Sequence, residues 1–205
     1  IEALSKGAEG IEFIIHEKIH YDLVNLFQKQ DEFSRLIKDI NLEKTPLRFV
    51  SGCSTGILLS MLDEEIKIQQ INPSKLHVSF DYDPIGHLTL NGNFFVSEEN
   101  IYKQMASLCN FYNNLNLNDK VIGINGYFFQ NAGSTLIQEI SLSLAIASEY
   151  LKQLSDLGLS IKQIAEKMSF NLGVGSNYFM EIAKYRAVRY LWTKLLEAFD
   201  ENAMN

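Results

Sequence analysis

Short apolar runs, each followed by a stretch of helical pattern, recur along the whole chain and constrain its fold more than any other feature. The five runs begin at Ile11, Leu47, Leu76, Val121 and Met168. Because a strand and the parallel strand that follows it need a crossover connection between them, this alternation predicts strand–helix units and a parallel sheet. The runs are mostly apolar, as in strands buried on both faces. We therefore predict an α/β fold with parallel strands.

Helical patterns fill most of the segments between these runs. We expect helices over residues 21–29, 32–38, 98–114, 134–156 and 161–167. A further amphipathic helix is expected to begin at Asn177, with a charged outer stripe made of Glu181, Lys184, Arg186 and Arg189. Residues 88–96 do not fit either pattern, and their Asn91-Gly92 pair predicts a small hairpin or an irregular loop.

Five strand–helix units are too few to close an eight-stranded barrel, which takes about 250 residues. The alternatives are an open, doubly wound sheet and an incomplete (β/α)8 TIM-type barrel. An open sheet usually carries a ligand signal at its first strand–helix turn, but Ile15-His16-Glu17-Lys18 has no glycine pattern. We therefore favour a single domain over residues 1–205 that forms part of a TIM-type barrel, as expected of a piece of a longer protein.

The composition excludes several classes of protein. The formal charge of −7 comes from 18 basic and 25 acidic residues with no dense basic run, which argues against nucleic-acid binding. No apolar run reaches the roughly 18 residues of a membrane span. Cys53 and Cys109 have no Cys-x-x-Cys companion, which argues against a disulfide scaffold or structural zinc site and fits a reducing cytoplasm. Cys53 is expected to be a small buried residue.

Two sets of polar residues follow the predicted strands in positions that suit metal chemistry. His16 and His20 fit the letters of the His-Glu-x-x-His zinc motif, but they directly follow a strand and lack an obvious third ligand. Asp81, Asp83 and His87 could bind a divalent cation or act as acid and base. A turn at Asp83-Pro84, with the carboxylate capping local amides, explains the second set better.

Gly173 and Gly175 precede the last helix and permit two interpretations. Backbone N–H groups at such a turn could cradle an anion. Close packing of the turn explains the two glycines equally well, because glycine lets neighbouring groups approach the backbone. None of these sets amounts to a catalytic constellation.

Three segments resemble the methylmalonyl-CoA mutase family. Residues 177–192 are similar to its F-F-M-E-I/V-A-K-x-R-A-x-R-x-L-W segment, and residues 124–135 resemble I-S-G-Y-H-M-Q-E-A-G-A-T. Residues 139–150 and 157–159 then match the long helix and G-L turn of the family, and residues 76–83 stand where the family has L-x-G-T-I-Q-N-D. The resemblance implies a substrate-binding (β/α)8 barrel, threaded by the CoA chain, in an enzyme that starts a radical rearrangement from adenosylcobalamin.

The chain departs from the family at the residues that would contact the substrate. Tyr127 is kept, but the histidine after it becomes Phe128, and a glutamate becomes Asn131. The glutamine of T-I-Q-N-D falls at Asp81, and an arginine before the next helix falls at Lys103, which cannot form a planar fork with a carboxylate. The pocket positions that the resemblance implies are Asp81, Lys103, Tyr127, Phe128, Gln130 and Asn131.

The resemblance therefore implies a smaller, non-catalytic subunit that pairs with the large catalytic subunit of a two-subunit mutase. The cobalamin motif D-x-H-x-x-G is absent, so we expect this chain to bind no cofactor and the partner to hold adenosylcobalamin. Phe128 and Phe129 are expected to fill the pocket. The alternatives are an active acyl-CoA mutase that uses Asp81, His87, Tyr127 and Gln130, and an unrelated metal-dependent barrel enzyme.

Overall fold

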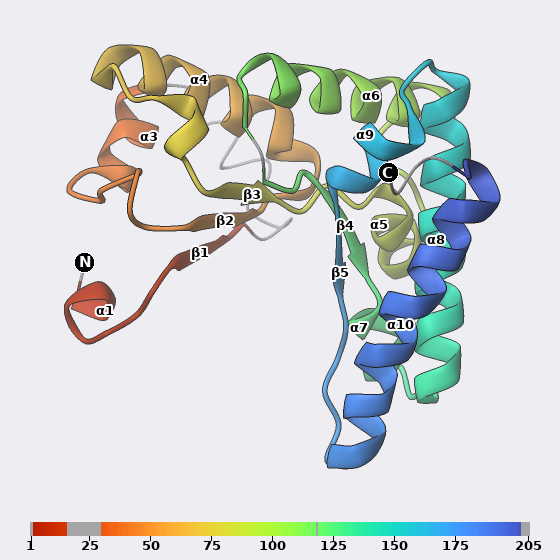
Figure 1. Ribbon diagram of the computed structural model, residues 1–205. Helices are drawn as coiled ribbons and strands as arrows, with labels where there is room; N and C mark the ends of the chain where they lie inside the picture. Colours follow the sequence, from red (N-terminus) through yellow and green to blue (C-terminus); the bar gives the residue numbers. More distant parts are fainter. Residues whose placement is uncertain (1, 16–29, 118, 202–205) are drawn as a thin grey trace. The chain divides into compact units, whose positions relative to one another are not determined.

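The computed structural model describes residues 2–15, 30–117 and 119–201 (Figure 1). They form two compact units, the first from residues 1–82 and 108–121 and the second from residues 83–107 and 122–205. Helix α6 (Glu98–Asn114) contributes residues to both units. Among these described residues, no helix is long and apolar enough to span a membrane.

The first unit is built on three parallel strands in the order β1-β2-β3. They are β1 (Ile11–Ile14), β2 (Leu47–Val50) and β3 (Val78–Phe80), with Ile11 opposite Leu47 and Leu47 opposite Val78. The helical segments of this unit are α1 (Glu2–Ser5), α3 (Gln30–Ile37), η2 (Gly52–Ser54), α4 (Thr55–Gln69) and η3 (Pro73–Lys75). Alternate side chains of each strand point to one face of the sheet and form part of the core. There the Phe49 ring stacks on the rings of Phe13 and Phe80, with centroid distances of 5.2 and 5.3 Å.

The second unit has two parallel strands, β4 (Ile122–Asn125) and β5 (Met168–Asn171), with Ile122 opposite Met168. Its helices are α5 (Pro84–Asn91), α7 (Tyr127–Asn131), α8 (Leu136–Asp156), α9 (Ile161–Glu166) and α10 (Tyr178–Phe199). Helices α8 and α10 pack against each other (Figure 1). Thr135 and Gln138 form a capping box that starts α8, because each side chain satisfies a backbone N–H at the helix end.

The α/β class and the parallel strands are confirmed, and all five expected strands are present within two residues of their predicted bounds. Helix α6 has the predicted ends. The helix expected over residues 21–29 lies outside the described residues.

Two local expectations were wrong, and one helix was not predicted. Residues 88–96 form no hairpin, because α5 runs to Asn91 and Gly92 takes the left-handed conformation (φ 75°) that ends the helix. Residues 92–96 form the irregular loop that was the alternative. Helix α4, which the sequence pattern did not indicate, follows β2. Cys53 is exposed on η2, the 3-10 turn between β2 and α4, rather than buried.

Candidate functional site

Asp83, three residues after the end of β3, caps the start of α5. Its Oδ1 accepts a hydrogen bond from the Gly86 N–H at 2.9 Å, and Pro84 takes the first helical position, where no N–H is needed. The carboxylate is buried, so the protein itself must supply its hydrogen bonds. The expectation that Asp83 caps local amides is confirmed.

The Asp83 carboxylate also links α8 and, through Asn125, the ends of β4 and β5 to the start of α5. The Tyr150 hydroxyl, from α8, donates to Oδ1 at 2.6 Å. Asn125, at the end of β4, donates to Oδ2 through its backbone N–H (3.1 Å) and its Nδ2 (2.9 Å). The Oδ1 of Asn125 accepts in turn from Nδ2 of Asn171, at the end of β5, at 2.8 Å. The carboxyl ends of β4 and β5 are therefore fixed to the start of α5.

Burial dominates the acid–base properties of this network. It raises the pKa of the Asp83 carboxyl, although the donors from Tyr150, Gly86 and Asn125 favour the charged form and oppose the shift. It also raises the pKa of the Tyr150 hydroxyl far above its usual value, and the neighbouring Asp83 adds to that shift. Tyr150 is therefore a hydrogen-bond donor at neutral pH and Asp83 its acceptor.

The short helix α7 follows β4 and carries four of the six pocket positions that the resemblance implies. Gly126 leads into it, and a Cβ there would lie 2.2 Å from Oγ of Ser143 and 2.8 Å from Cδ2 of Leu172, so only glycine fits. The rings of Tyr127 and Phe128 contact each other at 4.4 Å between centroids, and both residues are half-buried. This aromatic pair therefore lies just after the carboxyl end of β4.

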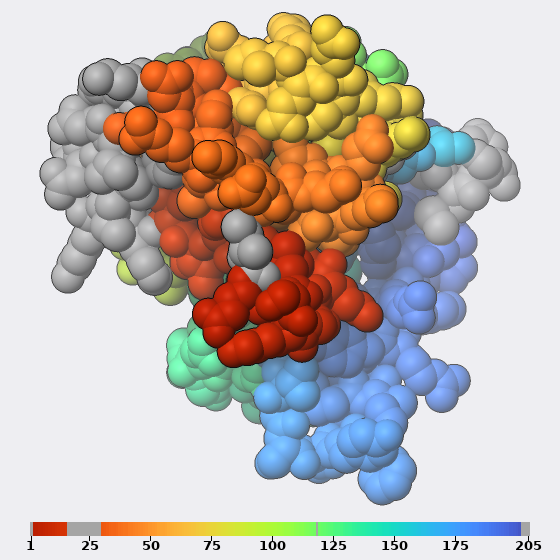
Figure 2. Space-filling model, turned by 90° about the vertical axis from the view of Figure 1, so that its left-hand side faces the viewer, coloured from red at the N-terminus to blue at the C-terminus, as the bar shows by residue number. Residues whose placement is uncertain are grey.

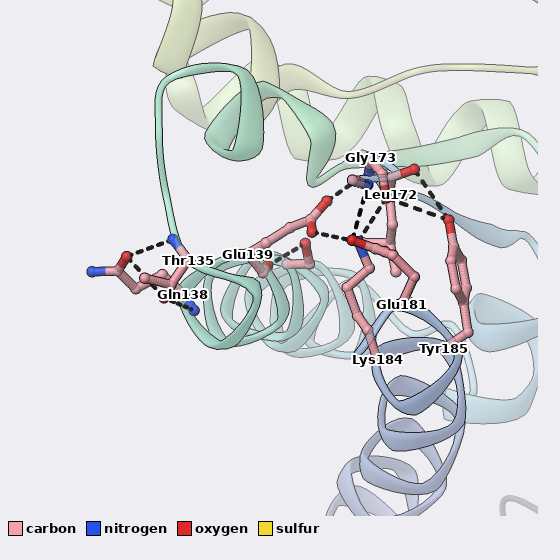
Figure 3. A network of polar contacts seen from close by, with 10 residues as sticks. Thr135, Gln138, Glu139, Leu172, Gly173, Glu181, Lys184 and Tyr185 are labelled. Carbon is pink, nitrogen blue, oxygen red and sulfur yellow. Dashed lines mark hydrogen bonds and ion pairs between the residues drawn. The ribbon is translucent and has the colours of Figure 1, made fainter. Parts of the chain in front are cut away.

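A buried cluster of charges holds the Gly-x-Gly turn between β5 and α10 (Figure 3). The Lys184 Nζ lies 3.0 Å from the Glu139 carboxylate and 2.6 Å from that of Glu181, and it donates to the Gly173 carbonyl at 2.6 Å. The two carboxylates accept the N–H groups of the turn: Glu139 from Gly173 (2.7 Å) and Glu181 from Gly175 (2.9 Å). The amides that were candidates for an anion cradle are therefore already bonded to the chain's own carboxylates.

The charges of this cluster stabilise one another. Burial alone would lower the pKa of the Lys184 ammonium, but its hydrogen bonds to Glu181 and Glu139 outweigh that effect and raise it. The hydrogen bond from Lys184 lowers the pKa of the Glu181 carboxyl. The charged forms of Lys184 and Glu181 are therefore both favoured. The prediction that Glu181 and Lys184 belong to an exposed charged stripe was wrong, because both are buried.

The structure gathers four of the six implied pocket positions on α7 and places the other two elsewhere. Gln130 packs against the turn after β5, since a Cβ on Gly173 would lie 1.3 Å from its Oε1, whereas Asn131 is exposed. Asp81 belongs to the first unit, buried at the end of β3 and 3.7 Å from the Arg48 guanidinium. Lys103 lies on the exposed face of α6, 2.6 Å from Glu99.

The residues considered for metal chemistry do not assemble within the described part of the chain. His16 and His20 lie outside that part. Among residues 2–15, 30–117 and 119–201, no group of three or more His, Cys, Asp or Glu side chains could hold a metal ion. His87 contacts the Phe95 ring at 4.1 Å between centroids and lies 3.1 Å from Nδ2 of Asn91.

Two surface hollows lie beside these networks. One, of about 530 Å³, lies over α7 and the start of α8 and is lined by Phe129, Ser134, Ile137 and Leu142, among others. The other, of about 330 Å³, lies between β5 and α10 and is lined by Phe170, Leu172, Tyr185, Val188, Arg189 and Trp192. Both are mostly apolar.

Sequence reasoning missed the residues that fix the site: Tyr150, Glu139, Asn171 and the buried Lys184. Each of these residues has a partner 34 to 67 positions away in the sequence, as in the pairs Glu139–Gly173 and Asp83–Tyr150. One signal was present: Glu181 and Lys184 are three residues apart on α10, which suits an ion pair.

The sequence matches a family model described as Methylmalonyl-CoA mutase over residues 26–205. The chain is 32% identical to the methylmalonyl-CoA mutase small subunit of Porphyromonas gingivalis, over 100% of this chain and 31% of that protein. It is 44% identical to the large subunit of the same organism over 78 residues, which are 38% of this chain and 11% of that protein.

A third relative is the methylmalonyl-CoA mutase large subunit of Streptomyces virginiae, which is 27% identical over 82% of this chain and 23% of that protein. The chain therefore spans less than a third of the length of these relatives. The match that extends over the whole chain is to a small subunit, whereas the two large subunits match over parts of it.

Proposed function

This chain belongs to the methylmalonyl-CoA mutase family, and we infer that it is part of a small, non-catalytic subunit that pairs with a large mutase subunit. The observation that carries this proposal is the extent of the similarity: the small subunit of Porphyromonas gingivalis matches over 100% of the chain, and the large subunit of that organism over 38%. On this proposal the assembled pair interconverts methylmalonyl-CoA and succinyl-CoA in the cytoplasm, and the large subunit performs the chemistry.

We further propose that the five parallel strands are part of a (β/α)8 barrel. The strand–helix alternation and the parallel pairing in both sheets support this architecture. The loops after β4 and β5 then lie at the carboxyl ends of barrel strands, where barrel enzymes place their active sites. Asn125, Asn171 and Asp83 hold those two ends in register.

The residues at this position support a pocket without chemistry. Phe128 stands where the resemblance implies a histidine, and a phenyl ring offers no proton and no hydrogen bond to a thioester carbonyl. Its ring packs on Tyr127. Asn131 points to solvent, and Asp81, in the first unit, is engaged by Arg48 of that unit. The polar side chains that the resemblance implies for the pocket are therefore either replaced by other residue types or already bonded to other residues of the chain.

The residues present do not fit adenosylcobalamin. The 205 residues contain no D-x-H-x-x-G stretch, and of the two described histidines His77 lies 3.6 Å from Asp119 while His87 packs on Phe95. We propose that the cofactor is held by the large subunit, and we assign no step of its chemistry to this chain.

Co-purification tests the pairing. The full-length protein and the large mutase subunit of the same organism are expressed together, and only the first carries an affinity tag. We expect the two to elute as one complex of equal stoichiometry in size-exclusion chromatography. Recovery of the tagged protein without the large subunit, at micromolar concentrations of both, would contradict the proposal.

A further inference from the structure

Two Asn-Gly pairs occur in the chain, Asn91-Gly92 and Asn125-Gly126, and their structural environments differ. In such a pair the backbone nitrogen of the glycine can attack the side-chain carbonyl carbon of the asparagine, because glycine has no Cβ to hinder the approach. The attack closes a cyclic succinimide, and water then opens the ring at either carbonyl. The asparagine is thereby converted to aspartate or, with the main chain rerouted through the side-chain carbon, to isoaspartate.

The reaction needs only water. The glycine nitrogen loses its proton and bonds to Cγ of the asparagine, while the bond from Cγ to Nδ2 breaks and that nitrogen leaves as ammonia. One water is consumed when the ring opens, and no atom changes its oxidation state. The product carries one negative charge more than the starting chain.

The first pair lies at the exposed end of a helix. Asn91 is the last residue of α5, and both it and Gly92 are exposed. Of the described residues, chain neighbours aside, none has an atom within 4 Å of the place where a Cβ on Gly92 would stand. In Figure 2, atoms in the yellow-green of α5 and the loop after it lie at the surface, at the left-hand edge of the view. Water and the space for ring closure are therefore available at this pair.

The contacts that hold the first pair all belong to the last turn of α5. The Gly92 N–H, which carries the attacking nitrogen, donates to the Leu88 carbonyl at 2.8 Å. Among the residues that the structure describes, the Asn91 amide bonds to His87 alone, through Nδ2 to its carbonyl (3.3 Å) and its Nδ1 (3.1 Å). Helix ends open at little cost in free energy, so these contacts slow the attack without preventing it.

The second pair is held by contacts with distant parts of the chain. Asn125 is 4% exposed, and Gly126 is buried. The Nδ2 of Asn125 donates to the buried Asp83 carboxylate at 2.9 Å, and its Oδ1 accepts from Asn171 at 2.8 Å. Asn125 is also paired with Asn171 between β4 and β5. Attack by the Gly126 nitrogen therefore requires the two strands to separate, which costs much of the unfolding free energy of the unit.

We propose that Asn91-Gly92 is a site of spontaneous deamidation in the native protein and that Asn125-Gly126 is protected by the fold. The reaction is independent of the proposed function. Isoaspartate at position 91 adds a methylene group to the main chain and places a carboxylate at the carboxyl end of α5, where the helix dipole disfavours negative charge. The modified chain is expected to lose the last turn of α5 and to keep the Asp83 cap at its other end.

The full-length protein is incubated at physiological temperature and pH, and isoaspartate is located by peptide mass spectrometry after enzymatic methylation. We expect isoaspartate at position 91 to accumulate about tenfold faster or more than at position 125, since a helix end opens more easily than β4 and β5 separate. In protein unfolded by urea, both pairs should react at similar rates, which isolates the effect of the fold. Gly92→Ala should slow the reaction about tenfold or more, because the added Cβ hinders the attack.

Three results would overturn this assignment. If the native protein forms no isoaspartate at position 91 in the time that the unfolded protein does, the helix end is protected in the full-length protein. If positions 91 and 125 react at the same rate in the native protein, the reaction proceeds only through global unfolding. If Gly92→Ala reacts at position 91 as fast as the wild type or faster, the glycine nitrogen is not the attacking group.

Discussion

Replacement of Lys184 by methionine tests the buried charge cluster most sharply. The Lys184 side chain is 0% exposed and its Nζ contacts two carboxylates and the Gly173 carbonyl. Methionine fills a similar volume but leaves Glu139 and Glu181 as buried charges whose remaining donors are single glycine amides. Because removing one partner from a buried ion pair destabilises by about 3–5 kcal/mol, we expect Lys184→Met to lower the free energy of unfolding by about that amount.

The same helix offers a matched control. Lys194 forms an ion pair with Glu197 at 2.6 Å, but both side chains are largely in solvent. Exposed pairs of this kind contribute about 0–1 kcal/mol, so Lys194→Met should be nearly neutral. Trp192, the one tryptophan of the chain, packs on Phe170 within the second unit and reports its unfolding in urea by fluorescence.

Two further measurements separate lost charge pairing from lost packing. Adding Glu139→Gln and Glu181→Gln to Lys184→Met should restore about 1 kcal/mol or more, because neutral amides replace the unpaired carboxylates. The deficit of Lys184→Met should also shrink on acidification, as the Glu181 carboxylate takes up a proton. If Lys184→Met is no more destabilising than Lys194→Met, the cluster does not stabilise the Gly-x-Gly turn and the reasoning is refuted.

Three other predictions concern the neighbouring contacts. Tyr150→Phe removes the 2.6 Å bond to Asp83 and the acceptor for the Ile85 N–H, so it should cost about 1.5–3 kcal/mol in urea unfolding, whereas Tyr190→Phe on the exposed surface should be neutral. Gly126→Ala should destabilise by about 1–3 kcal/mol, because the added Cβ would meet Ser143 and Leu172. Gly56→Ala is the control: it lies inside helix α4, and its Cβ would be 3.8 Å from the nearest neighbour, Leu108, so the change should be neutral or stabilising. Equal effects of the two substitutions would contradict the packing argument. The pKa of the Glu181 carboxyl is lowered from about 4.5. Its contribution to stability is therefore complete above pH 4.5 and is lost as the pH falls through the lowered pKa. Between pH 6 and pH 3, the free energy of unfolding should fall less steeply in Glu181→Gln than in the wild type.

The sequence pattern predicted the strands well because the signal is local. An apolar run bounded by polar residues marks each strand, and the ends of α6 follow from its own periodicity. The pattern failed where one local sequence signal is compatible with two different local structures. Asn91-Gly92 fits a hairpin turn and also a helix end, and the structure uses Gly92 as a left-handed helix cap.

The site could be predicted only in part, because its key contacts join residues far apart in the sequence. The cap at Asp83-Pro84 is local, and it was predicted. Tyr150 is 67 positions from Asp83 and Lys184 is 45 from Glu139, and no periodicity indicates such pairs. The same limit explains why Lys184 was expected in an exposed stripe: on α10 both faces are rich in apolar residues, so the pattern does not identify the buried face.

The most direct test of a non-catalytic role is an assay for turnover by the purified full-length protein alone. Methylmalonyl-CoA and adenosylcobalamin are supplied in excess, and succinyl-CoA is measured by chromatography with and without the large subunit. We predict no succinyl-CoA above the protein-free background from this protein alone, and steady turnover once the large subunit is added. Measurable isomerisation by the protein alone would contradict the account.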